Sequence, residues 1–282
     1  MTTVAVVGHA EWCHFAEVDH VPTPGEIVEA PSGWEQGAGG GAVAAVQIAK
    51  LAGECLFFTA LGGDEHGRRT QASLEEMGVR VFAAWRDAPQ RRAFVHLDAD
   101  GERTITTVGE RHAPRGDDPL PWAKLDDAGA VYVTAGGPGS AKAARAAEQL
   151  VATVRARSAF AGSGIRPDVL VASAADQGER YEPGDFEPAP VAVVRTAGSD
   201  GGSTEAGGET THWDPVPLPG ARVDEYGAGD SFAGGLTYGL GAGLSIERAI
   251  EIGSRCGAAN ITGRGPYEAQ LTAAALDETI SR

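Results

Sequence analysis

The stretch Val223-Asp224-Glu225-Tyr226-Gly227-Ala228-Gly229-Asp230-Ser231-Phe232-Ala233-Gly234-Gly235 is a glycine-rich turn that runs into an apolar helix. Backbone N–H groups at the start of a helix are unpaired and lie at the positive end of its dipole, so they can hold an anion such as a phosphoryl group. Gly227 and Gly229 let this backbone approach a ligand closely. Asp230, at the junction, can accept a proton from an attacking hydroxyl. The stretch therefore predicts phosphoryl transfer to an alcohol.

A plain capping role would explain the same aspartate. A glycine-rich turn with an Asp at the N-cap is an ordinary way to begin a helix, because the carboxylate accepts hydrogen bonds from the N–H groups of the first turn. The choice between a catalytic and a capping Asp230 therefore depends on the rest of the chain.

Length and charge limit the classes of protein to consider. The chain has 282 residues, 42% of them hydrophobic and 22% charged, which suits one large globular domain or a core with a small appendage. The formal net charge is −16, and no Lys/Arg run is longer than a pair, so nucleic acid is excluded as an expected partner. An anionic ligand such as ATP would need local compensation from helix N-termini, a few arginines and a divalent metal.

The sequence carries no targeting or cysteine pattern. Residues 1–8 lack the basic and long apolar regions of a signal peptide, and no apolar run is long enough for a membrane helix. We therefore expect a cytoplasmic protein without a membrane partner. Cys13, Cys55 and Cys256 are far apart and form no Cys-x-x-Cys, so we expect core or site-lining thiols instead of disulfides or a zinc site.

Strand-like and helix-like segments alternate along the chain. Short β-rich apolar runs predict buried strands at 4–7, 55–59, 79–85, 131–134, 169–172, 191–195 and 212–216. Amphipathic or Ala-rich segments predict helices at 42–52, 67–77, 140–157, 230–240, 246–261 and 271–280. This rhythm predicts a mostly parallel sheet with helices on both faces, and ligands outside the carboxyl ends of the strands.

Two segments depart from the α/β rhythm. Residues 11–34 are irregular, with short strands expected at 15–18 and 26–29. Residues 92–97 and 103–108 are β-rich and flank Asp98-Ala99-Asp100-Gly101, which predicts a hairpin. A calcium loop is the alternative for this Asp-x-Asp-Gly, but the remaining acidic positions of an EF-hand are missing. We expect the two segments to lie together.

Several motifs resemble those of one family. Asp224–Asp230 matches the signature Asp-Thr-x-Gly-Ala-Gly-Asp except at the second position, and the diglycine Gly39-Gly40 precedes an Ala-rich helix. Further matches in order and spacing are Pro24-Gly25-Glu26, Ala60-Leu61-Gly62-Gly63-Asp64-Glu65-His66-Gly67, Leu74-Glu75-Glu76-Met77-Gly78-Val79, Asp100-Gly101-Glu102-Arg103 and Thr196-Ala197-Gly198-Ser199-Asp200-Gly201. Across essentially the whole chain, the sequence resembles the ribokinase-like, or PfkB, family of carbohydrate kinases.

The resemblance implies one kinase domain over residues 1–282. Its fold would be a three-layer α/β/α arrangement with a mostly parallel central sheet, plus a small β-sheet lid formed by insertions at approximately 11–35 and 90–110. The lid would close over the substrate and is a candidate homodimer interface.

The resemblance also implies the parts of a kinase site. Asp230 would be the base, and the N–H groups of Gly227, Ala228 and Gly229 would form the anion hole. ATP would lie along the later strands. The turn from Thr196 to Gly198 would approach its triphosphate, and the helix containing Asn260 would border its adenine.

The acceptor side departs from the family pattern. Gly39 and Gly40 are retained, but Cys13 stands where sugar-binding members have Asp, and Val43 stands where they have Asn. The substrate contacts made through these positions must therefore differ from the family's usual ones.

The loop after Gly8 offers other contacts to an acceptor. His9, Glu11, Trp12 and His14 could bracket a ring by stacking and hydrogen bonding. Alternatively, Trp12 merely packs at the hinge of the lid.

The positions that would hold a metal ion also differ from the family pattern. The family's Asn-x-x-Glu, which organises magnesium through water, aligns with Ser173-Ala174-Ala175-Asp176, so Asp176 is the candidate for holding hydrated Mg²⁺. Glu225 replaces a threonine that helps to form a monovalent-cation site in some members, so we do not expect potassium activation.

The sequence thus predicts an ATP- and Mg²⁺-dependent kinase whose acceptor is a hydroxyl of a small sugar, polyol or nucleoside. The alternative is a degenerate relative that binds a sugar or nucleoside as a sensor. Asp230 beside an intact Gly-Ala-Gly argues against the sensor, because a binder needs no base. Motifs of other enzyme classes, such as Gly-x-x-x-x-Gly-Lys-Ser/Thr and Gly-x-Ser-x-Gly, are absent.

Overall fold

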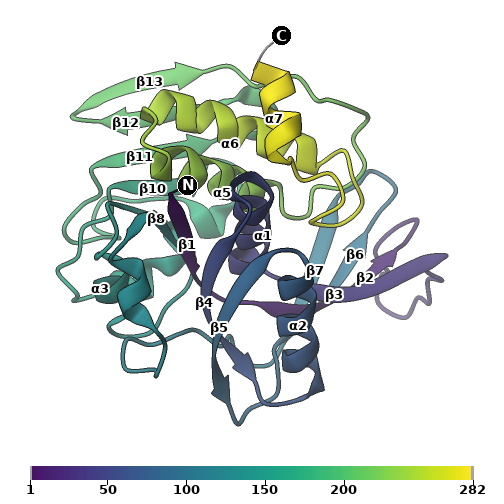
Figure 1. Ribbon diagram of the computed structural model, residues 1–282. Coiled ribbons are helices and arrows are strands. Elements are labelled where there is room, and N and C mark those ends of the chain that lie inside the picture. The colour runs from purple at the N-terminus through teal and green to yellow at the C-terminus, as the bar shows by residue number, and fades with distance from the viewer. Residues whose placement is uncertain (1, 281–282) are drawn as a thin grey trace.

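The structure is a computed structural model that describes residues 2–280. Its main sheet has nine strands in the order β13-β12-β11-β10-β9-β8-β1-β4-β5 (Figure 1). The strands are β1 (Thr3–Val7), β4 (Cys55–Gly62), β5 (Val79–Arg86), β8 (Ala128–Val133), β9 (Gln149–Thr153), β10 (Val169–Ser173), β11 (Ala192–Thr196), β12 (Gly202–Ala206) and β13 (Glu209–Trp213). From β5 to β11 all neighbours are parallel, and β12 and β13 add an antiparallel edge. The predicted mostly parallel sheet is confirmed.

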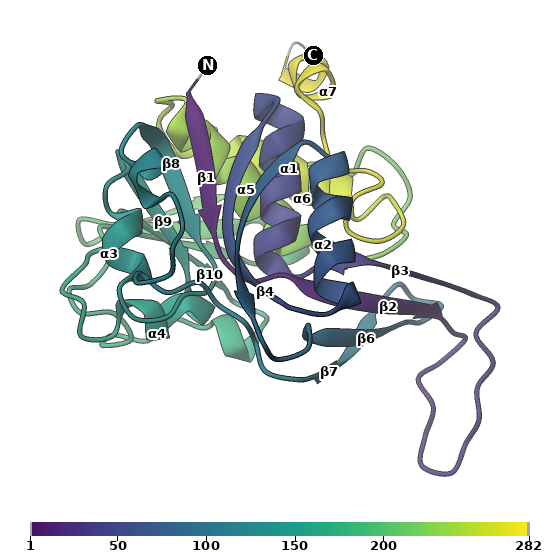
Figure 2. The same cartoon turned by 60° about the horizontal axis from the view of Figure 1, so that its bottom comes forward.

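Helices cover both faces of this sheet (Figure 2). One face packs against α1 (Gly40–Ala52), α5 (Ala228–Gly241) and α6 (Ile246–Asn260), with α2 (Glu65–Glu76) and α7 (Ala273–Ile280) at the sides. The other face carries shorter elements, α3 (Ser140–Ala144) and α4 (Arg157–Phe160) with the 3-10 turns at Trp122–Leu125 and Val154–Ala156. Strand β1 contributes alternate residues to the two cores, Val4 and Val6 to one and Ala5 and Val7 to the other. This division gives the three layers.

One predicted helix is wrong. Residues 140–157 form only the short helix α3, followed by strand β9 and the turn that leads to α4. The run from Leu150 to Val154 is apolar and β-rich, and β9 pairs in parallel with both β8 and β10. A place in the centre of the sheet therefore overrides the helical preference of the alanines around it.

The far edge of the main sheet also differs from expectation. The sequence predicts a strand at 212–216, but β13 spans Glu209–Trp213 and pairs with β12, for which the sequence pattern predicts no strand. Gly207 and Gly208 both have positive φ, at 60° and 85°, and connect the two strands. This hairpin depends on glycine, because side chains disfavour that backbone region.

A second, four-stranded sheet projects from the body in the order β3-β2-β6-β7 (Figure 2). It contains β2 (Glu11–Glu17), β3 (Ser32–Ala38), β6 (Arg92–Leu97) and β7 (Arg103–Val108). Strand β2 joins the two irregular segments, since it pairs antiparallel with β3 and parallel with β6. The predicted small sheet is confirmed, although its second strand lies at 32–38 and the one expected at 26–29 does not form. We call this sheet the lid.

The hairpin between β6 and β7 is a plain turn. The Asp98 carboxylate accepts hydrogen bonds from the N–H groups of Asp100 and Glu102, and Gly101 has a φ of 77°. The Asp98 carboxylate therefore serves the backbone of the turn, as expected of a hairpin. None of the helices within residues 2–280 combines the length and apolarity needed to cross a membrane.

Candidate active site

The side chain of Asp224 stabilises the turn before α5 by hydrogen bonds. This side chain is 2% exposed, and its oxygens accept hydrogen bonds from Tyr226 N at 2.6 Å and Gly265 N at 2.8 Å. Gly227 has a φ of 85°, and a Cβ atom there would lie 3.0 Å from Val43 Cγ1. Only glycine fits this bend, so Gly227 determines where α5 begins.

Asp230 does not cap the helix. The N-cap of α5 is Gly227, which has no side chain, and Asp230 is the third residue of the helix. The capping explanation considered for the sequence is therefore wrong. Within residues 2–280, no donor forms a hydrogen bond with the Asp230 carboxylate, which leaves its oxygens open to a ligand.

The surroundings of Asp230 favour a base. Burial raises the pKa of Asp230 to about 7, and the charge of Glu179 adds to this rise while Arg103 and Arg155 oppose it. A carboxylate with a pKa near neutrality accepts a proton far better than an ordinary aspartate, and about half of it is ionised near pH 7.

The start of α5 is open in front of this carboxylate. Gly229 is exposed, and a Cβ atom built on it would meet nothing within 4 Å. The N–H of Ala228 lies 3.3 Å from Glu225 O, a long hydrogen bond that a better acceptor can replace. Once that bond is replaced, the N–H of Ala228 joins those of Gly227 and Gly229 as amides that the dipole of a helix start makes attractive to an anion.

The diglycine lies directly against Asp230. A Cβ atom on Gly40 would lie 2.7 Å from Asp230 Oδ1, and one on Gly39 would lie 3.3 Å from Glu11 Cγ. Glu11 is 7% exposed, and its Oε1 lies 2.9 Å from Arg91 Nε. The structure thus brings Glu11, Gly39 and Gly40 together with Asp230.

Two other predicted acceptor residues lie under the turn. Cys13 is fully buried, with Sγ 3.4 Å from Tyr226 Oη, and burial raises its pKa to about 12. Val43 is fully buried beneath Gly227. Both side chains therefore pack the lid strand and α1 against the turn, and neither reaches the open space in front of Asp230.

Trp12 and His14 face α2, on the side of β2 opposite Glu11 and Cys13. Trp12 Nε1 donates to Glu35 Oε2 at 3.0 Å, and the Arg69 guanidinium lies 4.3 Å from the Trp12 ring. These contacts favour the alternative in which Trp12 packs at the hinge of the lid.

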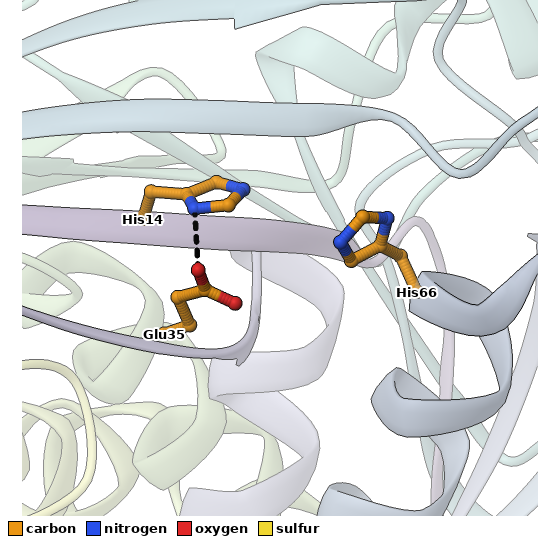
Figure 3. Close-up of side chains that lie close together, drawn as sticks. All are labelled: His14, Glu35 and His66. Atoms are coloured by element: carbon orange, nitrogen blue, oxygen red, sulfur yellow. Dashed lines mark ion pairs between the residues drawn. The ribbon is translucent and has the colours of Figure 1, made fainter.

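Figure 3 shows His14, Glu35 and His66 converging, with possible ligand atoms within 4.8 Å of one another. His14 Nδ1 lies 3.1 Å from Glu35 Oε1, and Arg69 lies 3.6 Å from the other carboxylate oxygen. Glu35 is thus already balanced by Arg69 and by neighbouring hydrogen-bond donors, and the cluster joins the lid to α2.

The predicted ATP residues lie farther along the sheet. Thr196 ends β11, where its hydroxyl donates to Ala172 O at 3.3 Å, and Gly198 is exposed with a φ of 58°. Asn260 ends α6 but is fully buried, and its amide donates to Pro266 O at 2.8 Å. Thr196 and Gly198 are therefore accessible to a nucleotide, whereas the Asn260 side chain holds the loop that packs against Gly227.

Asp176 forms part of an ionic group with Arg155. Arg155 lies 2.5 Å from Asp176 Oδ2 and 2.7 Å from Glu179 Oε1, while Asp176 Oδ1 accepts from Gly178 N at 2.7 Å. Sequence reasoning missed Arg155 and Glu179, although Glu179 influences Asp230 directly. The spacing Asp176-Gln177-Gly178-Glu179 could have revealed it, because it keeps the family's Asn-x-x-Glu with Asp in place of Asn.

Comparisons with known sequences agree with the motifs. A model of the family described as pfkB family carbohydrate kinase matches residues 1–177 and 187–273. The ATP-dependent ribose-1-phosphate kinase of Halopiger xanaduensis is 28% identical over 304 residues, which cover 100% of this chain and 99% of that relative. The fructokinase of Salmonella typhimurium is 26% identical over 309 residues, which cover 91% of this chain and 95% of that relative.

Solved structures agree with the fold. The ribokinase of Thermotoga maritima has a TM-score of 0.80 at 20% identity, with 100% of both chains covered. The ribokinase of Arabidopsis thaliana, solved with ribose and ATP, has a TM-score of 0.78 at 22% identity and covers 100% of this chain and 99% of its own. The predicted ribokinase-like arrangement of three layers with a small lid is confirmed. Since the family model matches nearly the whole length, the chain belongs to the pfkB family of carbohydrate kinases.

Proposed function

We propose that this enzyme transfers the γ-phosphoryl group of ATP to a hydroxyl of a small sugar, polyol or nucleoside. The observation that carries the proposal is the pairing of Asp230, whose pKa is raised to about 7, with the open first turn of α5. A base and an anion site at one helix start are what phosphoryl transfer to an alcohol requires.

In the proposed reaction, an acceptor hydroxyl lies between Asp230 and the γ-phosphorus. Asp230 takes the hydroxyl proton, the acceptor oxygen forms a bond to the γ-phosphorus, and the bond between that phosphorus and the β,γ-bridging oxygen breaks. ADP leaves with the electron pair of that bond. The N–H groups of Gly227, Ala228 and Gly229 stabilise the charge on the transferring group. Gly40 keeps space for the acceptor beside the Asp230 oxygens.

The relatives favour a sugar among the three acceptor classes. The full-length relatives are named a ribose-1-phosphate kinase and a fructokinase, and one structural neighbour contains ribose and ATP. These names differ in whether the acceptor already carries a phosphate, so they support a sugar without identifying it.

ATP is proposed to lie over the ends of β10 and β11, with Thr196 and Gly198 near its phosphates and α6, which ends at Asn260, beside its adenine. Mg²⁺ would neutralise phosphate charge during transfer. The acidic residues fit a hydrated ion better than direct ligation, because Arg155 already pairs with both Asp176 and Glu179. Within residues 2–280, Glu179 Oε2 has no hydrogen-bond donor, so Glu179 joins Asp176 as a candidate to hold the waters of the ion.

A screen separates this kinase from a sensor that only binds. The protein is incubated with ATP, Mg²⁺ and panels of sugars, sugar phosphates, polyols and nucleosides, and both ADP release and thermal stability are measured. Acceptor-dependent ADP release is the expected result. Thermal stabilisation by a ligand that never triggers ADP release would support the sensor instead.

A further inference from the structure

Arg91 contacts Glu11 on the acceptor side of Asp230, and the positive charge of Arg111 acts on the same carboxylate. Arg91 precedes β6, and besides its contact with Glu11 it donates through Nη2 to Thr107 Oγ1 at 2.8 Å. Arg111 follows β7 and is half-buried. The positive charges of Arg91 and Arg111 both affect the pKa values of Glu11 and His9, and the charge of Arg91 affects the pKa of Arg111. The four side chains therefore form one electrostatic group. We call Arg91 and Arg111 the arginine pair.

The charges in this group do not balance. One carboxylate, Glu11, faces two guanidinium groups, and burial raises the pKa of Glu11 and so weakens its negative charge. Among the residues that the structure describes, Arg111 has neither an ion pair nor a hydrogen-bond acceptor for its buried Nε. Burial and repulsion from Arg91 lower the pKa of Arg111. A half-buried cation in this state is stabilised by any anion that enters the group.

Two buried polar atoms near the end of β1 lack hydrogen-bond partners in the described part of the chain, one on His9 and one on Thr134. His9 is 8% exposed, and its Nδ1 has no hydrogen-bond partner within residues 2–280. Burial, and then Arg111 and Arg91, lower the pKa of His9 to about 3, so its ring is neutral and can donate one hydrogen bond. Thr134 Oγ1 also lacks a partner there and packs against Gly8 and Gly41. Buried polar atoms normally find partners, so these two atoms are available to hydrogen-bond a ligand.

This group lies at the acceptor end of the site. Glu11 contacts Gly39, the neighbour of the Gly40 that faces Asp230. The strand that leads to His9 is β1, which is separated from β11 and Thr196 by β8, β9 and β10. At ~4.8 Å per strand, the ATP end of the sheet is about 19 Å away.

We propose that the acceptor is itself a phosphate monoester, such as a sugar phosphate, and that Arg111, together with Arg91 and His9, binds its phosphate group. This inference rests on the proposed kinase function. A guanidinium offers a planar fork that matches two phosphate oxygens, and the neutral His9 supplies a third donor. Because the chain carries a net charge of −16, a dianionic acceptor is repelled in general and needs such a local group.

The γ-phosphate of ATP is the other phosphate that could reach this group. It is the less suitable source, because the start of α5 already provides amides for it. The charge of Arg155 also acts on His9 and Arg111, but Arg155 is already paired with Asp176 and Glu179. The two sources predict different kinetic effects when Arg111 is changed.

The first test compares matched acceptors with the wild-type enzyme. Ribose is compared with ribose 1-phosphate and ribose 5-phosphate, and fructose with fructose 1-phosphate and fructose 6-phosphate, by ADP release in the presence of ATP and Mg²⁺. At least one phosphate ester should have a kcat/KM about 100-fold above its parent sugar, since two charge-assisted hydrogen bonds supply that difference. Parent sugars that react as well as their phosphates would overturn the proposal.

The second test uses Arg111→Gln, with Arg92→Gln as a matched control. Arg92 is the next residue after Arg91, and its guanidinium lies 5.8 Å from the Phe94 ring on the face turned away from Glu11. Arg111→Gln should raise the KM for the sugar phosphate more than about tenfold and leave the KM for ATP unchanged, and Arg111→Lys should restore part of the loss. Arg92→Gln should change neither. A raised KM for ATP alone would assign Arg111 to the nucleotide and contradict the proposal.

Binding without turnover separates this proposal from the kinase function. In an Asp230→Asn background, the preferred sugar phosphate should raise Tm more than its parent sugar does, and Arg111→Gln should abolish that difference. Equal stabilisation by the two compounds would contradict the anion site without contradicting the kinase function. If no sugar, sugar phosphate, polyol or nucleoside caused ADP release by the wild type, the kinase function itself would fail, and the inference with it.

Discussion

Asp230 combines an open carboxylate with a pKa raised to about 7, and both properties follow from its place in the first turn of α5. Only the ionised form can accept the hydroxyl proton. The kcat/KM for the acceptor should therefore fall about tenfold for each pH unit below 7 and level off above it. Initial rates between pH 5 and 9 check this, with circular dichroism confirming that the protein stays folded. A flat profile across pH 5 to 8 would contradict a base with this pKa.

Gly40 is expected to be needed for catalysis more than for folding. It opens α1 without a positive φ, so alanine fits its backbone, but the new Cβ would lie 2.7 Å from Asp230 Oδ1 and displace the carboxylate. Gly40→Ala should lower kcat/KM by about 10- to 100-fold and change the free energy of unfolding by less than about 1 kcal/mol.

Gly220→Ala is the matched control for this variant. Its Cβ would lie 3.6 Å from the nearest atom, an ordinary contact, and its φ is not positive. The control should keep full activity. If Gly40→Ala were equally active, the placement of an acceptor beside Gly40 would be wrong.

At the scale of elements, the turn before α5 depends on Asp224. This buried carboxylate accepts from Tyr226 N and Gly265 N, and so ties the turn to the loop after α6. Asp224→Ala leaves both N–H groups without their acceptor and should cost about 2–4 kcal/mol in unfolding free energy, together with most of the activity. Asp224→Asn retains one acceptor oxygen, so its unfolding free energy and activity should lie between those of the wild type and of Asp224→Ala. Urea denaturation and kcat/KM measure these effects, and an alanine variant as stable as the wild type would exclude this role.

The elements also show where sequence patterns stop being sufficient. The α/β alternation and the glycines of the turn act locally, so the start of α5 and the strands β6 and β7 could be predicted. Strand β9 could not, because its pairing with β8 and β10 decides against the helical preference of its alanine-rich flanks. A one-residue alternation likewise decides that Trp12 faces α2 while Glu11 faces the site.

Within the site, the limits of prediction have the same cause. Asp230, Gly39 and Gly40 belong to local motifs and could be found in the sequence. Arg111 and Arg155 do not, since each becomes part of the site only when distant elements come together. Glu11, on which the charge of Arg111 acts, and Glu179, which pairs with Arg155, lie on other segments, and charge balance between segments appears only in three dimensions.

At the scale of the whole molecule, the lid leaves one strand edge uncovered. All six residues of β7 are exposed at the edge of the small sheet, including Ile105 at 42%. An exposed edge with apolar side chains can pair with a second copy, so we expect a homodimer through the lid. Sedimentation equilibrium should show a dimer, and Ile105→Lys should give a monomer. Leu244→Lys, at a similarly exposed leucine outside the lid, should remain dimeric. A monomeric wild type at assay concentrations would contradict this expectation.

The role of Asp230 as the base of a phosphoryl transfer is tested by the turnover of Asp230→Asn with the acceptor found in the screen. An amide of the same shape cannot take the proton, so kcat should fall about 10²- to 10⁴-fold while the protein still binds ATP and acceptor. Thermal unfolding at pH 8 serves as the control for folding. Turnover at the wild-type rate would show that Asp230 is not the base.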